Sequence, residues 1–384
     1  MTFLHRIKPK RRSDSRWRCR VSWSIALVIC AANGSFVAAD TMQPRVVLGP
    51  WAKGLHVGPK MATRSIRLWG SEFVGQDLSG ASFDDCDLSG VVFRQCNLTN
   101  ASFQRSVLSG MVLDDCTFVR NDLTDAVIND WRVGSPGASP LLTPEQLSST
   151  WSYKNKKLSG CTIHLSGLGI KDNAEATAIV PISFAGFELI KTRFASVNLE
   201  TVDFSGARIY SPEFHACHIS LRGLRKAEVL DLKESRFQSV TFAEPPNFAG
   251  EALTSAVIYT ANTELHIDDA EVTELSAGPW VDAEELSSTR NYQRGIFLGL
   301  VLINCDLSGM DFSNQVLVQC TFRGCDFSGA KFEDAVVSSV NFLGNTKGLT
   351  AAQFRSTWNY KHSRMDSVQL PDALASQLDL QPGE

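Results

Sequence analysis

The chain has 384 residues, of which 43% are hydrophobic and 20% are charged, and its formal net charge is −4. This is enough chain to bury a large core. The acidic balance argues against a protein that binds nucleic acid.

The first 39 residues have the composition of a secretory signal. Residues 1–20 carry eight basic side chains and one acid, and the apolar stretch Val21–Ala32 follows. The small-residue sequence Val37–Ala39 then precedes Asp40, as at a signal cleavage site. We predict export to the periplasm, the envelope or the medium after cleavage near Ala39, which leaves a chain of net charge −11. An uncleaved anchor over residues 21–39 is the alternative, although its purely apolar run is short for a membrane span.

After a lead-in over residues 40–65, a repeat of five residues runs through residues 66–130. Each repeat has one large apolar residue, which we call its centre, and a small residue two positions earlier, which we call its inner slot. A period of five fits neither a helix nor a flat strand, so it requires a chain that turns a corner every five residues. Residues two apart on an extended segment point the same way, so each repeat sends both inward. The centres are Phe73, Leu78, Phe83, Leu88, Phe93, Leu98, Phe103, Leu108, Leu113, Phe118, Leu123 and Ile128.

The repeat returns twice. Residues 158–281 form a second, irregular array, in which the weakly patterned residues 262–281 are expected to be a loop with some strand. Residues 297–345 form a third array. The core residues that we predict in these two arrays are Phe194, Leu199, Phe204, Leu307, Phe312, Phe322, Phe327 and Phe332.

A second motif separates the arrays, at residues 143–154, 282–293 and 350–361. Each copy begins with a pair typical of a capping box at the start of a short helix. The pairs are Thr143 with Gln146, Asp282 with Glu285, and Thr350 with Gln353. Leu147 and Trp151, four residues apart, are expected on one helix face that seals a coil. We therefore predict a loop and capped helix over residues 131–157, a capped helix over 282–296, and a helical cap and tail over 346–384.

The repeats Cys86-Asp87-Leu88-Ser89-Gly90 and Cys325-Asp326-Phe327-Ser328-Gly329 show the pattern clearly. It resembles the pentapeptide-repeat family, whose pattern is Ala-Asp/Asn-Leu-x-x. The resemblance implies an all-β solenoid, a right-handed four-sided β-helix with four repeats in each coil. Here it would form three segments, interrupted and capped by short helices. Each coil would stack about 4.8 Å from the next and bury its apolar residues against its neighbours.

Eight cysteines follow the signal, and all of them occupy inner slots. They are Cys86, Cys96, Cys116, Cys161, Cys217, Cys305, Cys320 and Cys325. We expect them to fill these slots as free thiols, since free cysteine packs as a small hydrophobe. The members of the pairs Cys96/Cys116 and Cys305/Cys325 are separated by four repeats, or one coil. A disulfide between adjacent coils therefore stays open as an alternative for each pair.

No motif for catalysis or for a cofactor occurs in the sequence. His215-Ala216-Cys217-His218 should place its cysteine inside and its histidines outside, so they should not share a metal ion. The carboxylates of Asp84-Asp85 and Asp114-Asp115 are expected on solvated corners, with calcium binding as the alternative. Trp51, Trp69 and Trp131 are interpreted as plugs at the ends of the first array. We predict no catalytic, cofactor or metal site.

These observations favour a non-enzymatic, exported scaffold or protein-interaction module. Its partner would be another protein or an envelope component, without nucleic acid, and its oligomeric state is open. The resemblance implies one alternative, a DNA-mimicking protein that binds topoisomerases and confers quinolone resistance. Proteins of that type are cytoplasmic and usually have an unbroken coil, and this chain departs from both features. An enzyme that uses the irregular residues 225–281 is the other alternative.

Overall fold

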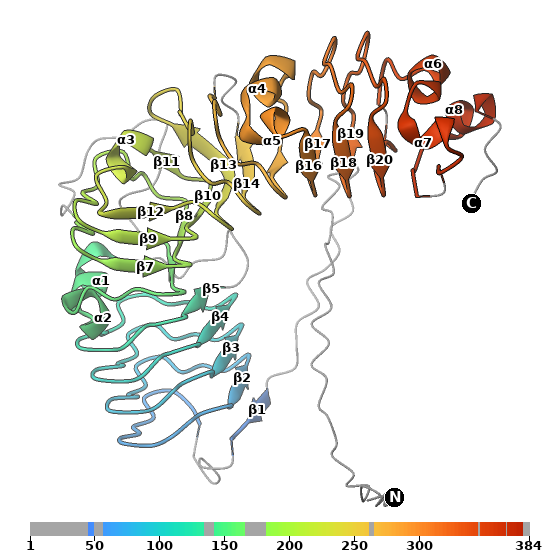
Figure 1. Ribbon diagram of the computed structural model, residues 1–384. Coiled ribbons are helices and arrows are strands. Elements are labelled where there is room, and N and C mark those ends of the chain that lie inside the picture. Colours follow the sequence, from blue (N-terminus) through green and yellow to red (C-terminus); the bar gives the residue numbers. More distant parts are fainter. Residues whose placement is uncertain are drawn as a thin grey trace, which may run out of the picture. The chain divides into compact units, whose positions relative to one another are not determined.

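The computed structural model describes residues 45–49, 57–133, 142–165, 182–260, 265–344, 346–365 and 367–378. All of them belong to one compact unit, Met42–Glu384. They form a β-solenoid whose short strands pair in parallel from coil to coil, with short helices among them (Figure 1). The predicted all-β solenoid is therefore confirmed. The proposed signal, residues 1–39, lies outside the described residues. No helix in the described part of the chain is long and apolar enough to span a bilayer.

A step of four repeats relates neighbouring coils of the first array. Phe73 pairs with Phe93, and Phe93 pairs with Leu113. Bridges with the same step join the other three sides of the coil. They link Asp77 with Asn97, Ser82 with Ser102, and Asp87 with Val107. Each coil therefore contains four repeats, one on each side.

The strands form four sheets. The first contains β1 (Arg45–Val47), β2 (Glu72–Val74), β3 (Val92–Arg94), β4 (Val112–Asp114) and β5 (Arg132–Val133). The longest contains β6 (Thr162–Ile163), β8 (Arg193–Ala195), β10 (Glu213–His215), β11 (His218–Ile219), β13 (Arg236–Phe242), β14 (Val257–Thr260), β15 (Ser276–Ala277), β17 (Val301–Ile303) and β19 (Thr321–Arg323). The third contains β7 (Glu188–Ile190), β9 (Arg208–Tyr210) and β12 (Val229–Asp231). The fourth contains β16 (Ile296–Leu298), β18 (Val316–Val318) and β20 (Val336–Ser338). Only β1 pairs antiparallel among the named strands, and it covers the edge of β2.

The corners of the coil need a left-handed backbone two residues after a centre. Asp85 and Arg105 adopt φ values of 57° and 54° at such corners. At Gly324, with φ 63°, a Cβ atom would lie 2.2 Å from Oδ1 of Asn304 on the neighbouring coil. Any other residue there would require the Asn304 amide to move, whereas glycine has no Cβ and adopts positive φ without strain.

The interior is filled by the centres, which stack along the solenoid. The rings of Phe83 and Phe103 are nearly parallel, with centroids 5.2 Å apart, and those of Phe73 and Phe93 are 5.0 Å apart. Such offset stacking adds to the stabilisation from burial. The twelve centres of the first array and the eight core residues predicted in the other two arrays are all at most 2% exposed.

Each copy of the second motif folds as two helices rather than the single helix expected. The pairs are α1 (Pro144–Ser149) with α2 (Trp151–Lys154), α4 (Ala283–Ser288) with α5 (Arg290–Gln293), and α6 (Ala351–Arg355) with α7 (Trp358–Lys361). Thr150 separates the first pair with an extended backbone, φ −68° and ψ 152°. Its hydroxyl donates to the carbonyl of Leu147 (2.7 Å) and accepts from the N–H of Tyr153 (3.1 Å). One buried threonine thus ends one helix and caps the next.

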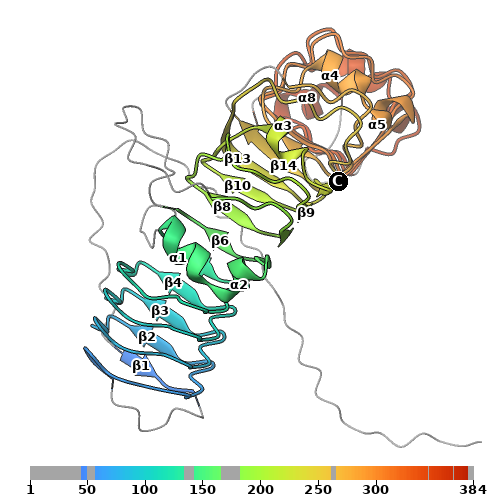
Figure 2. The same cartoon turned by 90° about the vertical axis from the view of Figure 1, so that its left-hand side faces the viewer.

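These helix pairs are packed into the stack of coils, and apolar residues from each pair join the core. Leu147, Leu286 and Phe354 are fully buried, and Phe354 stacks on Phe332 with ring centroids 6.0 Å apart. Backbone hydrogen bonds join α1 and α2 to the preceding coil: the N–H of Asp125 donates to the carbonyl of Ser149, and the N–H of Trp151 donates to that of Ala126. In Figure 2 the two helices lie between the coils of the first array and β6. The expectation that Trp151 shares the sealing face with Leu147 is wrong: Trp151 is 41% exposed, because the break at Thr150 turns α2 away from the direction of α1.

Residues 265–281 were expected to be a loop with some strand, and the strand is present as β15. The loop is not, because the segment forms part of a coil. Val257 pairs with Ser276, a step one residue shorter than four repeats, and β15 extends the longest sheet. The missing residue shifts the register before residue 265, since Ala252 pairs with Glu271 at the same shorter step. Within the segment the five-residue period is kept, because Ile267, Val272 and Ala277 are all buried. Leu265, Ile267 and Leu275 are fully buried.

Two further helices complete the described chain. Helix α3 (Leu221–Leu224) turns a corner of the second array and buries Leu221 and Leu224. Helix α8 (Asp372–Gln377) follows Pro371 at the C-terminal end. It buries Leu374 and, just after it, Leu378, and Arg355 donates to the carbonyl of Gln377 (2.7 Å). The part of the C-terminal tail that the structure describes is therefore packed onto the solenoid.

Candidate functional site

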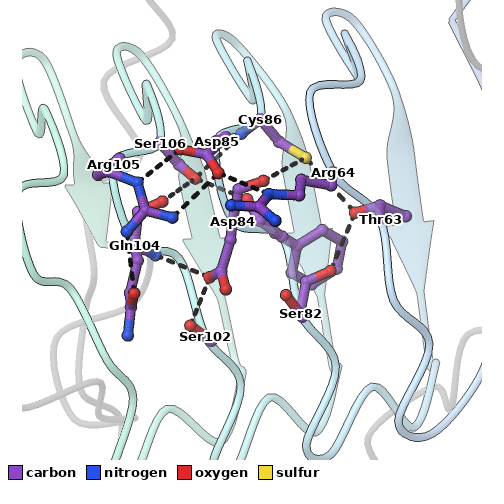
Figure 3. Close-up of polar contacts among 11 residues, drawn as sticks. Thr63, Arg64, Ser82, Asp84, Asp85, Cys86, Ser102, Gln104, Arg105 and Ser106 are labelled. Carbon is purple, nitrogen blue, oxygen red and sulfur yellow. Dashed lines mark hydrogen bonds and ion pairs between the residues drawn. The ribbon is translucent and has the colours of Figure 1, made fainter.

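Charged side chains on the outside of the first array form columns across successive coils. Asp85 lies between Arg64 and Arg105 (Figure 3). Its carboxylate accepts from Nε of Arg105 (2.6 Å) and from Nε of Arg64 (3.0 Å). The hydrogen bond from Arg105, followed by that from Arg64, lowers the pKa of Asp85 to about 2. The carboxylate is therefore charged and paired at neutral pH.

The charges of these columns alternate along the stack. The Asp85 column continues to Asp125, which pairs with Lys154 of α2 (2.7 Å). A second column runs from Glu72 through Arg94 to Asp114, with contacts of 3.2 and 2.6 Å. Asp85 on its corner and Asp114 at the end of β4 are therefore in ion pairs, whereas solvated carboxylates on corners were expected. Three arginines offset part of the charge of the ten acids in residues 71–130, which leaves this segment a net charge of −7.

The two carboxylates of Asp84 and Asp85 do not act together. Asp84 accepts from the Ser102 hydroxyl and from the N–H of Gln104 (3.0 Å), both on the next coil (Figure 3). In the described ranges, no group of three or more His, Cys, Asp or Glu side chains gathers where a metal ion could bind. The paired aspartates serve to join coils.

The His215–His218 segment also spreads its side chains apart. Cys217 is fully buried and donates to the carbonyl of Phe194 (3.2 Å). His218 lies on the outside, with Nε2 3.4 Å from the carboxylate of Glu200. Burial, and then the charge of Arg193, lowers the pKa of His215. Its imidazole is therefore mostly neutral at pH 7.

All eight described cysteines are free, buried thiols, each with its sulfur against the carbonyl two residues earlier. Burial raises the pKa of Cys161 to about 12 and that of Cys320 to about 11. The Cys96/Cys116 pair is stacked as the spacing suggested, with the N–H of Cys96 3.5 Å from Sγ of Cys116. The contact with Cys96, and then burial, raises the pKa of Cys116. Cys116, Cys161 and Cys320 are therefore poor nucleophiles, because the thiolate is the reactive form of cysteine.

The predicted helix caps differ among the three copies. The capping box is complete at Thr143 with Gln146 and at Thr350 with Gln353. At Asp282 only half of it forms: Asp282 accepts from the N–H of Glu285 (2.8 Å), but the Glu285 carboxylate accepts from Ile267 N–H instead (2.9 Å). The prediction of a third capping box is therefore wrong.

The chemistry of the side chains explains this difference. The amide of Gln146 accepts within the box and also donates to the carbonyl of Asn121 on the coil below (2.8 Å). Gln353 does the same with the carbonyl of Ala330 (2.9 Å). A glutamate carboxylate has no N–H to donate. Glu285 therefore binds the coil below through an N–H group rather than through a carbonyl.

Sequence reasoning missed one buried polar position in the second helix of each pair. Its side-chain oxygen accepts from the N–H of a centre on the coil below, which would otherwise lack a partner. The three bonds are Ser152 with Ile128 (3.0 Å), Asn291 with Val272 (2.7 Å), and Asn359 with Val337 (2.6 Å). The sequence feature that could have predicted this role is a polar residue at the same position in all three copies of the motif.

The tryptophans are only partly where they were expected. Trp131 is buried and packs edge-on against Phe118, with centroids 5.6 Å apart. Trp69 is 60% exposed, so its assignment as an end plug is wrong. It follows the centre Leu68 directly, and alternation along the chain therefore directs it outward. Trp51 lies outside the described residues.

The sequence matches the model of one repeat family. Residues 64–95, 96–130 and 299–342 match the family model of pentapeptide repeats, in eight copies. No curated protein sequence matches the chain.

Solved structures of pentapeptide-repeat proteins are similar to the chain at low identity. One is HetL, a pentapeptide repeat protein involved in heterocyst differentiation regulation from the cyanobacterium Nostoc. It is 16% identical over 73% of this chain and 89% of HetL, with a TM-score of 0.16. Another is QnrB1, a plasmid-mediated fluoroquinolone resistance protein. It is 14% identical over 83% of this chain and 94% of QnrB1, with a TM-score of 0.12. At these values neither protein is a guide to function.

Proposed function

Because the chain is a pentapeptide-repeat protein, we propose that it is a non-enzymatic scaffold that binds another protein in the cell envelope or outside the cell. The observation that carries this proposal is the filled interior of its coils. Phe83, Phe103 and the other stacked centres occupy the inside of the solenoid. A partner protein would therefore contact the outward-facing side chains, which the coils hold at regular spacing.

The alternating charge columns favour a scaffold over a DNA mimic. A DNA mimic must present a continuous negative surface like that of the phosphate backbone. Here Arg64 and Arg105 flank Asp85, and Arg94 lies between Glu72 and Asp114. Each of these columns changes sign from coil to coil.

The irregular second array shows the same filled interior. Phe237, Phe248 and Ile258 are fully buried within residues 225–281, where an enzyme would need a site. Their packing continues that of the regular coils, since Phe237 stacks on Phe214 with centroids 5.3 Å apart. This supports a binding role for the region rather than catalysis.

Export is the second part of the proposal and is supported by the composition of residues 1–39. It is tested by fractionating native cells and sequencing the N-terminus of the recovered protein. We expect a start at Asp40 in a soluble envelope or secreted fraction. An intact basic N-terminus in the cytoplasm would overturn export.

The scaffold role is tested by cross-linking the tagged full-length protein in its native cells and identifying the proteins that are cross-linked to it. The control is Phe103→Asp, which buries a charge in the first array and removes the folded surface. A protein captured by the wild type but not by this variant, at equal protein levels, should bind the purified wild-type protein directly. Failure to reconstitute any captured protein would contradict the scaffold role.

A further inference from the structure

The two ends of the solenoid differ in how the backbone of the outermost coil is covered. At the C-terminal end, where α6, α7 and α8 lie (Figure 1), each side of the last coil is hydrogen-bonded to a segment that follows it in the chain. The coil residues that make these bonds are Phe327, Ala330, Ala335 and Phe342. At the N-terminal end, β1 covers one side by pairing with β2.

The first coil carries free backbone groups on two neighbouring sides. Ala62 is bridged to Ser82 of the next coil through the backbone groups of its two neighbours in the chain, so its own N–H and C=O point away from the stack. Arg67 is bridged to Asp87 in the same way. Both residues are exposed, and within the ranges that the structure describes no group bonds to these two N–H and two C=O groups. We call these four groups the open edge.

The next coil shows what the open edge lacks. The N–H and C=O of Ser82 and of Asp87 occupy the equivalent positions, and all four bond to the first coil. The open edge therefore faces the position that a preceding coil would occupy. Backbone groups of this kind are a template for pairing with an extended segment of another chain.

Strand β1 shows that this end of the solenoid accepts an added strand. It pairs antiparallel with β2, with Val46 opposite Phe73. Arg45 of the added strand also contacts Glu72 of the coil, at 3.2 Å. An extended segment thus binds here through its backbone, and a pair of opposite charges supports the contact. The open edge offers the same backbone groups on two further sides.

The open edge lies in a basic segment of an acidic chain. Residues 57–70 contain Lys60, Arg64 and Arg67 and no acid, which gives +3, whereas the whole chain is at −4. Arg64 pairs with Asp85 of the next coil. Lys60 and Arg67 are exposed and form no ion pair within the described ranges. These two cations favour an acidic segment as the partner of the open edge.

The backbone chemistry selects a peptide among acidic polymers. The carbonyls of Ala62 and Arg67 need hydrogen-bond donors, and their N–H groups need acceptors. An extended peptide supplies both at every residue. The phosphates of a nucleic acid only accept hydrogen bonds, so they would leave the two carbonyls without partners.

A second copy of the chain fits the open edge less well. Its C-terminal end is already hydrogen-bonded on each side to the capping segments, so it has no matching edge to offer. Two N-terminal ends brought together would place two segments of charge +3 against each other.

We propose that the open edge is the docking site of an extended, acidic segment of a partner protein, which adds to the first coil as a further strand. The proposal rests on the scaffold function proposed above and names the surface and the partner chemistry.

The first test places the photo-cross-linker p-benzoylphenylalanine at Ala62 in the full chain, in its native cells. The matched control carries it at Val107, which is 36% exposed on a coil with a neighbouring coil on either side. We expect Ala62 to cross-link a protein segment in which Asp and Glu outnumber Lys and Arg. A cross-link to this same chain, to lipid or nucleic acid, to a segment without that excess, or no product above the Val107 control would overturn the proposal.

The charge of the edge is tested in the same cells. Arg67→Glu should remove the product that forms from Ala62, because it repels an acidic segment. The control is Arg120→Glu, which changes the net charge equally at an exposed corner of the first array. This control should keep the product. Equal yields from the two variants would overturn the acidic character of the partner.

The backbone pairing is tested with the purified protein and a synthetic peptide of the cross-linked segment. In hydrogen exchange, the N–H groups of Ala62 and Arg67 should exchange freely in the protein alone and become protected when the peptide is added. Ala62→Pro removes one of these N–H groups without breaking a bond of the fold, and it should weaken binding about tenfold. Ala62→Ser should leave binding unchanged, and equal melting temperatures would show that both variants fold. Binding without protection of the two amides in the wild type would overturn the proposal.

Protein cross-links from Val107 but not from Ala62 would overturn the docking site and leave the scaffold function standing. No protein cross-link from either position, together with no protein captured by the tagged chain, would contradict both.

Discussion

Arg105 contacts both carboxylate oxygens of Asp85 on the neighbouring coil, through Nε at 2.6 Å and Nη2 at 2.9 Å. Such a two-pronged contact is the strongest geometry available to an arginine and a carboxylate. Arg64 approaches the same carboxylate from the coil on the other side. Three coils are therefore joined by one acid and two bases.

The stability contribution of Asp85 should depend on pH. Its pKa lies near 2 in the folded protein and at 3.8 as a free side chain, so pairing stabilises the fold above about pH 4. The contribution should decline as the pH falls from about 4 to about 2. We expect Asp85→Asn to melt below the wild type at pH 7, with the difference shrinking across this window. Asp87→Asn, whose carboxylate accepts from Ser89, is the control. A difference that stays constant down to pH 2 would contradict the ion pair.

The stacked core of the first array should not tolerate polar substitution. Phe103 is fully buried against Phe83, so Phe103→Ala should cost about 3–5 kcal/mol of unfolding free energy. Phe103→Asp should unfold the array, because it buries an unpaired charge. The matched control is Val107→Asp, since Val107 is 36% exposed one repeat later. Denaturant unfolding measures all three variants, and normal stability of Phe103→Asp would refute the repeat register.

The threonine between paired helices should matter more than its exposed neighbours. Thr150→Val keeps the shape but leaves the carbonyl of Leu147 and the N–H of Tyr153 without their partner. We expect a loss of about 1–3 kcal/mol in unfolding free energy. Ser148→Ala removes an exposed bond to Glu145 and should change little. Equal effects of the two substitutions would contradict the capping role of Thr150.

The cysteines should be unreactive until the protein unfolds. Burial raises the pKa of Cys161 to about 12 and that of Cys217 to about 11, so little thiolate exists at pH 8. We expect almost no reaction with a thiol reagent in the native state. All eight cysteines from Cys86 to Cys325 should react after unfolding without a reductant. Recovery of only four thiols would show disulfides in the two stacked pairs.

Much of the fold could be read from residue spacing. Phe83 and Phe103 are four repeats apart in the sequence, and the structure stacks them on neighbouring coils as that spacing requires. The caps at Thr143 and Thr350 were also recognisable, because capping depends on residues only three apart. The spacing was harder to recognise at residues 265–281, because one missing residue before Leu265 shifts the register of the repeat, although Ile267, Val272 and Ala277 keep the five-residue period.

The sequence by itself determined the solenoid, because with a five-residue period the position of a residue in the repeat decides whether it points inward, points outward or forms a corner. Tertiary structure decided how residues on different coils meet outside the core. Asp85 pairs with Arg64 and Arg105, and the carboxylate of Glu285 accepts from the N–H of Ile267. These contacts depend on which side chains a given stacking places side by side. The local repeat fixes the direction in which a side chain points. The residue that it contacts outside the core lies on another coil, and the local repeat does not specify it.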